Sequence, residues 1–137
     1  MNGEKTSNRL DYSQTMVGHL GIVFLPSEEE ETVRAEMPVD YRTCQPHGVL
    51  SGGASLALAE MAAGYGSMLL CREGERANGV QVSGNHISTA PLGEKVFATG
   101  RLIHRGRSSH IWNVDITTPE GKLVSTVRVV NFILTTK

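Results

Sequence analysis

The longest apolar stretch of the chain covers residues 52–71. Alanine, leucine and methionine are distributed around its whole helical circumference, so it shows no polar face. A helix that is apolar on all sides is normally buried, and we predict a long central helix here. Its one charged residue is Glu60, whose carboxylate needs a partner, a shifted protonation state or a chemical role.

The remainder of the chain is dominated by patterns typical of strands. Apolar and polar positions alternate, or short apolar runs end at turn residues, in six segments: 20–25, 32–37, 79–88, 96–104, 110–117 and 123–134. Residues 8–18 form a candidate short amphipathic helix. The charged, glycine-containing segment 72–76 is expected to end the central helix. The pattern therefore predicts about six strands and one long helix.

Strands that follow one another through tight turns pair mostly in the antiparallel sense. A single sheet curled round one apolar helix is the simplest α+β arrangement, and we expect residues 1–137 to form one such domain. Because a curved sheet leaves one side of the helix uncovered, we also expect a partner subunit, most simply in a symmetric dimer.

Composition narrows the class of protein. The chain is 39% hydrophobic and 20% charged, as soluble globular proteins are, and its net charge of −1 argues against binding to nucleic acid or an anionic membrane. Residues 52–71 have the length of a membrane span, but Glu60 and four glycines argue against that interpretation. Cys44 and Cys71 form no disulfide framework and the polar N-terminus resembles no targeting peptide, so we expect a cytoplasmic protein.

One motif carries a family resemblance. The order Gln45-Pro46-x-Gly48-x-x-x-Gly52-Gly53-Ala54-Ser55, followed by Glu60, resembles hotdog-fold acyl-CoA thioesterases. The closest likeness is to the branch with the phenylacetate-pathway, aryl-CoA and 1,4-dihydroxy-2-naphthoyl-CoA enzymes. Further similar segments extend the likeness over nearly the whole chain from residue 16: Met37-Pro38-Val39-Asp40, Asn85-His86, Gly93-x-Lys95-Val96, His104-x-Gly106 and Trp112.

The resemblance implies a reaction and its central residues. The expected activity is hydrolysis of an acyl-CoA with an aromatic or medium-chain acyl group, and no cofactor is needed because coenzyme A is part of the substrate. Glu60 matches the helix carboxylate that attacks the thioester carbonyl or activates water. Gly52 matches the backbone N–H donor to the thioester oxygen, a role that suits the positive end of a helix dipole. Gln45 matches the polar residue that orients water or the carbonyl.

Ser51 departs from the family pattern, which usually has histidine immediately before the two glycines. Serine is a good helix N-cap, and its hydroxyl is also able to donate one hydrogen bond to the substrate. The change puts the rate and the substrate in question. His47, four residues earlier, either supplies the missing imidazole or is an ordinary residue of a surface loop.

A second group of residues is expected to bind substrate. The resemblance implies that Gly53 lies beside the oxyanion donor and that His86 lines the acyl pocket. It also implies that Gly79 and the turn His104-Arg105-Gly106-Arg107 hold the nucleotide end of coenzyme A, for which arginines are suitable phosphate donors. A hydrogen-bonded strand histidine and a charged hairpin turn are the structural alternatives. No segment has the spacing of metal ligands.

The helix itself predicts how sites are assembled. Gly52 and Glu60 are eight positions apart, which is about 12 Å along a helix, so one carbonyl cannot meet both in the same chain. A homodimer with shared active sites solves this, and the resemblance implies a dimer of dimers. Two rival functions stay open: an acyl-thioester dehydratase, which usually needs a histidine–carboxylate pair, and a non-catalytic acyl-CoA binding protein.

Overall fold

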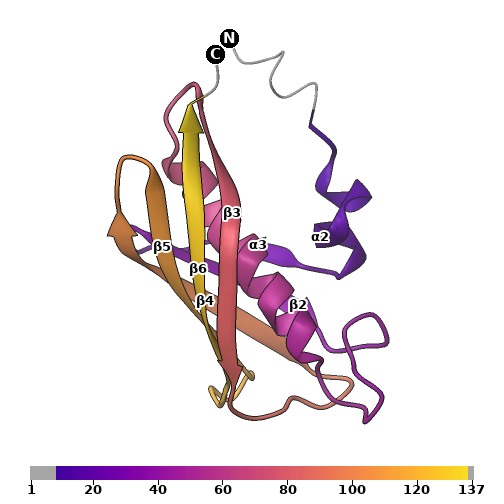
Figure 1. The fold of residues 1–137 in the computed structure, drawn as a ribbon. Helices are drawn as coiled ribbons and strands as arrows, with labels where there is room; N and C mark the ends of the chain where they lie inside the picture. Colours follow the sequence, from indigo (N-terminus) through magenta and orange to yellow (C-terminus); the bar gives the residue numbers. More distant parts are fainter. Residues whose placement is uncertain (1–8, 136–137) are drawn as a thin grey trace.

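The computed structural model describes residues 9–135 (Figure 1). Its elements, in chain order, are the 3-10 helix η1 (Tyr12–Gln14), α2 (Met16–His19), β1 (Val23–Leu25), β2 (Thr32–Pro38), α3 (Gly52–Leu70), β3 (Glu75–His86), β4 (Lys95–Arg105), β5 (Ser109–Thr117) and β6 (Leu123–Thr135). The predicted amphipathic helix over 8–18 corresponds to η1 and α2, except for its first position, which lies outside the described residues.

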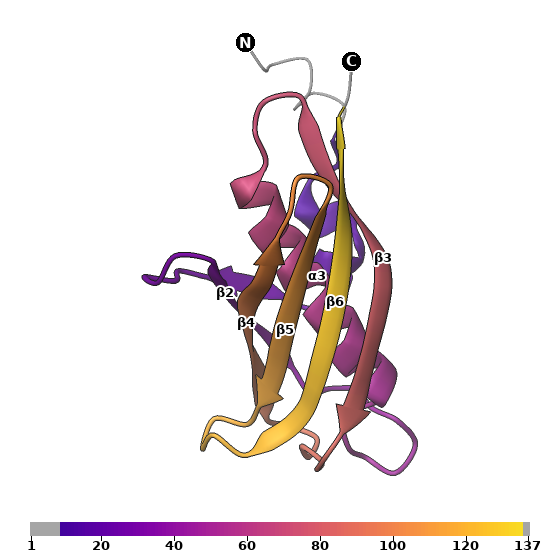
Figure 2. The same cartoon turned by 60° about the vertical axis from the view of Figure 1, so that its left-hand side comes forward.

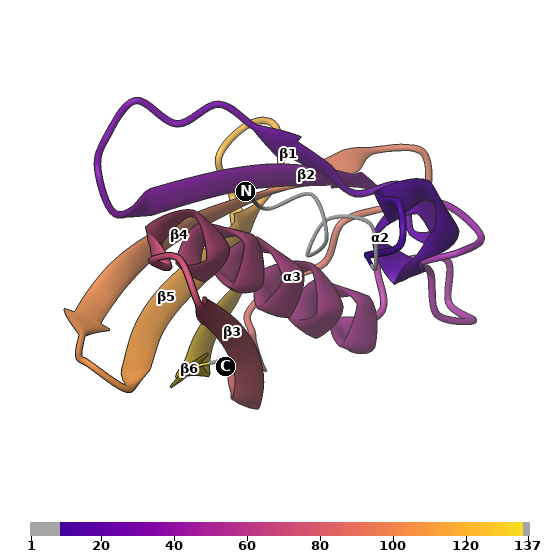
Figure 3. The ribbon, with the colours of Figure 1, turned by 90° about the horizontal axis from the view of Figure 1, so that it is seen from above.

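The strands of the described chain form one six-stranded antiparallel sheet in the order β1-β2-β4-β5-β6-β3. The sheet is strongly curved, and α3 lies along its concave face (Figure 2). Seen from above, β1 and β2 lie along one side of α3, and β5, β6 and β3 lie along the other (Figure 3). This confirms the predicted α+β architecture of one sheet wrapped round one long helix.

A side-chain hydrogen bond marks the start of helix α3, and a change of backbone conformation marks its end. The Ser51 hydroxyl oxygen accepts a hydrogen bond from the Gly53 N–H at 3.2 Å and caps the first turn. After Leu70 the chain becomes extended, and Gly74 adopts a φ of 86°, a left-handed conformation that glycine reaches without strain. The helix also lies very close to the sheet, because a Cβ built on Gly66 would be only 2.6 Å from the ring of Trp112.

The alternation predicted for the two central strands is confirmed. The inward positions of β4 and β5 are buried and form the core with the sheet-facing side of α3: Val96, Ala98, Gly100, His110, Trp112, Val114 and Ile116. Burial of these side chains against the helix is the main force that holds the helix and sheet together.

Three details differ from the sequence prediction. Strand β3 begins at Glu75, four residues before the predicted segment 79–88, because the residues before Gly79 also pair with β6, as far as the pair Glu75–Thr135. Strand β1 is shorter than the predicted 20–25, because Leu20 caps α2. The helix was expected to be buried all round, yet one side of α3 is open, where Gly53 and Glu60 lie about two turns apart and are both exposed. Leu69 is exposed near the C-terminal end of the helix, on a different side. No described helix is long and apolar enough to span a bilayer.

Candidate active site

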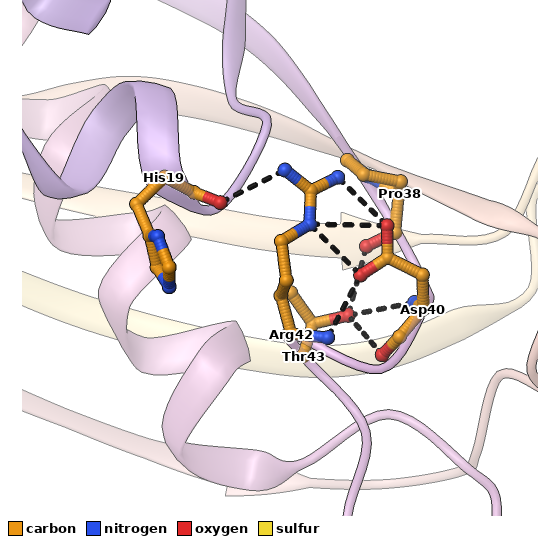
Figure 4. A network of polar contacts seen from close by, with 5 residues as sticks. All are labelled: His19, Pro38, Asp40, Arg42 and Thr43. Atoms are coloured by element: carbon orange, nitrogen blue, oxygen red, sulfur yellow. Dashed lines mark hydrogen bonds and ion pairs between the residues drawn. The ribbon is translucent and has the colours of Figure 1, made fainter.

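The loop that leads into α3 is held by an ion-pair network (Figure 4). The Arg42 guanidinium donates to both carboxylate oxygens of Asp40, at 2.7 Å for Nη2 to Oδ2, and also to the backbone oxygen of His19 at 2.8 Å. The Thr43 hydroxyl donates to the backbone oxygen of Pro38 at 2.9 Å. These hydrogen bonds from Arg42 lower the pKa of Asp40, so the pair stays charged at neutral pH. The network fixes the start of the loop that carries Gln45.

A cavity of about 210 Å³ lies at the N-terminal end of α3. Its walls come from the loop before α3, the first turn of α3, the end of β3 and the start of β6: Gln45, Val49, Leu50, Gly52, Ser55, His86, Ser88, Thr89, Val124 and Ser125. Three residues predicted for the site, Gln45, Gly52 and His86, thus meet in one cavity, although His86 comes from a strand far along the chain from the other two.

His86 packs directly over the start of the helix. A Cβ built on Gly52 would lie 2.5 Å from His86 Nε2, so only glycine at this position leaves room for the imidazole. The other ring nitrogen, Nδ1, is 2.7 Å from the hydroxyl oxygen of Ser125 on β6. The ring is therefore held from one side and presents Nε2 to the helix terminus. Of the two interpretations of His86 that the sequence allowed, the structure shows a hydrogen-bonded strand histidine that also lines the cavity.

The other predicted residues of the loop have structural contacts. Gln45 Oε1 accepts a hydrogen bond from the backbone N–H of His47, which fixes the turn between them. The His47 residue itself is exposed and is not part of the cavity wall. Ser51 accepts from the Gly53 N–H, so its hydroxyl acts as the helix N-cap. The Ala54 and Ser55 N–H groups both donate to the Ser51 backbone oxygen, at 3.1 and 3.2 Å, so in the first turn the Gly52 N–H is the one without a partner among residues 9–135.

Glu60 lies in the middle of α3, on its open side. The residue is exposed, and its carboxylate makes no hydrogen bond or ion pair with any part of the chain from residue 9 to residue 135. The expectation that an apolar helix would shield this carboxylate from water is therefore wrong for the single chain, because Glu60 lies beside Gly79 of the edge strand β3, where no further strand covers it.

Gly79 and the turn at residues 104–107 lie in one row across the sheet, three strands apart, through the pairs Gly79–Asn131, Asn131–His110 and His110–Arg105. Gly79 faces Glu60, since a Cβ built on it would be 2.7 Å from Glu60 Oε2. The turn lies at the C-terminal end of α3, where Arg105 Nη2 donates to the backbone oxygen of Leu70 at 3.4 Å and its Nη1 is 3.6 Å from Glu31 Oε2. The role of Gly79, His104, Gly106 and Arg107 in holding the nucleotide end of coenzyme A stays a prediction.

Sequence reasoning missed a buried polar cluster formed by Ser67, His110, Trp112 and Asn131. The Ser67 hydroxyl oxygen accepts from Trp112 Nε1 at 2.8 Å and from Asn131 Nδ2 at 3.0 Å, and it lies 2.8 Å from His110 Nδ1. A hydroxyl has two acceptor sites and one proton, so Ser67 donates to His110. The signal available in the sequence was Ser67, a polar residue on an otherwise apolar helix face, which needs hydrogen-bond partners when it is buried.

The cluster keeps His110 neutral. Because Ser67 donates to Nδ1, that nitrogen is an acceptor, which only the uncharged imidazole offers. Burial lowers the pKa of His110, and the nearby positive charge of Arg105 lowers it further. Asn131 completes the cluster with a second donation, from Nδ2 to the backbone oxygen of Ala63 at 3.2 Å. Among residues 9–135, no group of three or more His, Cys, Asp or Glu side chains is placed to hold a metal ion.

Comparison with known proteins identifies the family. Residues 47–125 match the family model of the thioesterase superfamily. The proofreading thioesterase EntH of Klebsiella pneumoniae is 40% identical over 114 residues, which cover 83% of this chain and 82% of that protein. A thioesterase structure from Haemophilus influenzae superposes with a TM-score of 0.85 at 38% identity, covering 90% of this chain and 85% of that one.

A thioesterase from Staphylococcus aureus, solved as two alanine variants, gives TM-scores of 0.80 and 0.82 at 33% identity, covering 86% and 88% of this chain and 97% and 99% of that protein. The first variant replaces a glutamine and the second a glutamate. Family model, sequence relatives and fold agree, and the chain belongs to the thioesterase superfamily as a hotdog-fold thioester hydrolase.

Proposed function

We propose that the chain hydrolyses an acyl-CoA thioester with an aromatic or medium-chain acyl group, giving the free acid and coenzyme A. The observation that carries this proposal is the cavity at the N-terminus of α3, which gathers Gln45, Gly52 and His86. The resemblance to the aryl-CoA branch supports an aromatic acyl group, as does an imidazole in the cavity wall on which a flat group can pack. The two free cysteines, Cys44 and Cys71, fit a reducing cytoplasm.

Each group has a distinct role in the proposed mechanism. The thioester oxygen accepts a hydrogen bond from the Gly52 N–H, where the helix dipole stabilises developing negative charge. The side-chain oxygen of Gln45 accepts a hydrogen bond from the His47 N–H, so the amide nitrogen of Gln45 is left to orient the carbonyl or a water molecule. Glu60 either takes a proton from the attacking water or attacks the carbonyl carbon itself, which forms a mixed anhydride that water then hydrolyses. In both routes the C–S bond breaks, and the coenzyme A thiolate takes up the proton that the water molecule loses.

The site is completed by a second copy of the chain. Glu60 is absent from the walls of the cavity that contains Gly52, and along the helix the two residues are about 12 Å apart. The open side of α3 and the unpaired edge of β3 lie next to each other, which provides a surface for an antiparallel partner. In such a dimer, Glu60 of each subunit faces Gly52 and Gln45 of the other, and two dimers pair into a tetramer.

The relatives support the pairing of Gln45 with Glu60. The glutamine and the glutamate replaced in the two Staphylococcus aureus structures are separated by the same number of positions as Gln45 and Glu60. The name of the Klebsiella relative, a proofreading thioesterase, supports thioester hydrolysis as the class of reaction.

A subunit-mixing experiment tests the shared site. Glu60→Ala and Gln45→Ala are prepared separately, unfolded together and refolded. Random pairing gives about half heterodimers, each with one intact and one doubly damaged site, so activity is expected to recover to roughly a quarter of wild type. Activity is followed as free thiol released from a panel of benzoyl-CoA, phenylacetyl-CoA and octanoyl-CoA.

The matched control refolds Glu60→Ala with Glu60→Gln, where no pairing creates an intact site, and it should stay inactive. A Gln45→Ala and Glu60→Ala mixture that contains heterodimers and remains as inactive as its parents would overturn the shared site. Absence of thiol release by the wild type from every acyl-CoA of the panel would favour the dehydratase or binding-protein alternatives over hydrolysis.

A further inference from the structure

The structure assigns Gly79 a role in positioning the Glu60 carboxylate, which lies against the strand because Gly79 has no side chain. This inference rests on the proposed role of Glu60 and adds a residue from a different element to the site. It replaces the expectation that Gly79 binds the nucleotide end of coenzyme A.

Strand pairing explains why Gly79 faces the helix. Gly79 of β3 pairs with Asn131 of β6, and paired residues of neighbouring strands point to the same face of the sheet. Asn131 is only 1% exposed and donates to the Ala63 oxygen and the Ser67 hydroxyl of α3, so this face is the one under the helix. Glu60 lies about one turn before Ala63, and its side chain reaches across to β3 at the sheet edge.

The contact leaves no room for a side chain. A Cβ on residue 79 would be 2.7 Å from Glu60 Oε2 and 3.5 Å from its Cδ, and the first distance is shorter than real carbon–oxygen contacts. Because the obstructing atom is the end of a flexible side chain, the fold tolerates a methyl group while the carboxylate has to move.

Asn131 limits where the carboxylate goes. Its Oδ1 is buried without a hydrogen-bond partner among residues 9–135 and lies 3.5 Å from the same Cβ position. This oxygen carries partial negative charge, as a carboxylate does, so a displaced Glu60 cannot shift toward it. The carboxylate would instead swing away from the strand, out of the place from which it meets a partner subunit's substrate.

The test is Gly79→Ala, assayed with the panel acyl-CoA that the wild type hydrolyses fastest. A displacement of about 1 Å is expected to lower kcat by about 10²-fold, with KM and the melting temperature close to wild type. Glu60→Asp shortens the side chain by one methylene and relieves the clash. The double variant Gly79→Ala/Glu60→Asp should therefore match the activity of Glu60→Asp alone, a non-additivity that a purely structural glycine would not give.

Two controls separate the positioning role from a general disturbance of β3 and from nucleotide binding. Asn78→Ala changes the adjacent, exposed residue on the opposite face of β3 and should keep wild-type kcat. The N-acetylcysteamine thioester of the same acyl group lacks the nucleotide, and Gly79→Ala should slow its hydrolysis as much as that of the acyl-CoA. If Gly79→Ala and wild type turn over this short substrate equally, Gly79 acts in nucleotide binding and the inference is overturned.

The remaining outcomes are also decisive. Wild-type kcat in Gly79→Ala, with Glu60→Gln inactive, would overturn the positioning role alone, whereas an active Glu60→Gln would overturn the proposed role of Glu60. If Glu60→Asp has no measurable turnover, a crystal structure of Gly79→Ala decides the matter. A displaced carboxylate supports the inference, and an unmoved one overturns it.

Discussion

Polar side chains on the two sides of α3 differ in whether they have hydrogen-bond partners within the chain. On the side facing the sheet, the Ser67 hydroxyl is fully used by hydrogen bonds to His110, Trp112 and Asn131. On the open side, the Glu60 carboxylate makes no hydrogen bond or ion pair with residues 9–135 and stays exposed to solvent. One helix therefore presents a satisfied polar cluster to its own sheet and an unsatisfied charge to the outside.

This difference separates residues that serve stability from the residue to which we assign a catalytic role. A buried polar group without a partner is costly, so the Ser67 cluster has to be complete for the chain to fold well. An exposed carboxylate carries no such penalty and contributes little to folding. Its position at the β3 edge of the sheet leaves it open to solvent, as its proposed role on a substrate held by a partner subunit requires.

The largest effect should come from the open side. Glu60→Gln keeps the shape of the side chain and removes its charge, so turnover should fall by about 10²-fold or more, because the base or nucleophile is lost. The free energy of unfolding should change by less than about 0.5 kcal/mol, as for an ordinary surface substitution. Thiol release and urea unfolding measure the two quantities. Retention of more than about a tenth of wild-type turnover would show that Glu60 is neither the base nor the nucleophile, and the functional contrast between the two sides of α3 would be wrong.

The second effect belongs to the sheet side and should have the reverse signature. Ser67→Ala removes the acceptor of two buried donors and the donor to His110, so it should lower the free energy of unfolding by about 2–4 kcal/mol. The kcat of the folded fraction should stay near that of wild type, because the cluster does not line the cavity. Ser83→Ala, at an exposed site on β3, is the control and should be neutral. A large loss of kcat at full folding would show that the two sides are not independent.

The smallest effect is the pH dependence of the same cluster. Since the pKa of His110 is lowered in the folded state, the unfolded chain binds its proton more readily. The resulting stability is fully present above the ordinary histidine pKa of about 6.5 and is lost as pH falls below it, until the lowered folded pKa is reached. Urea unfolding between about pH 8 and pH 5 measures this slope. His110→Asn should flatten it, whereas His47→Gln, at an exposed residue, should leave it unchanged.

Much of the fold could be predicted from the sequence because its determinants are local. The unbroken apolar run predicted α3 to within a residue at its C-terminal end, and the N-capping Ser51 defines its start. Period-two alternation predicted β4 and β5 and their buried faces, since side chains on a strand must point alternately in and out. The family motif predicted Gln45 and Gly52, which the structure then places in one cavity.

What the sequence did not reveal depends on contacts between distant segments. The sheet order puts β3 beside β6, and only that pairing brings Gly79 to Glu60 and Asn131 to Ser67, residues that no local pattern connects. The exposure of Glu60 was decided in the same way. Periodicity tells which residues are apolar, but a sheet of finite width covers only part of the circumference of a helix, so the part left open is set by how the strands wrap.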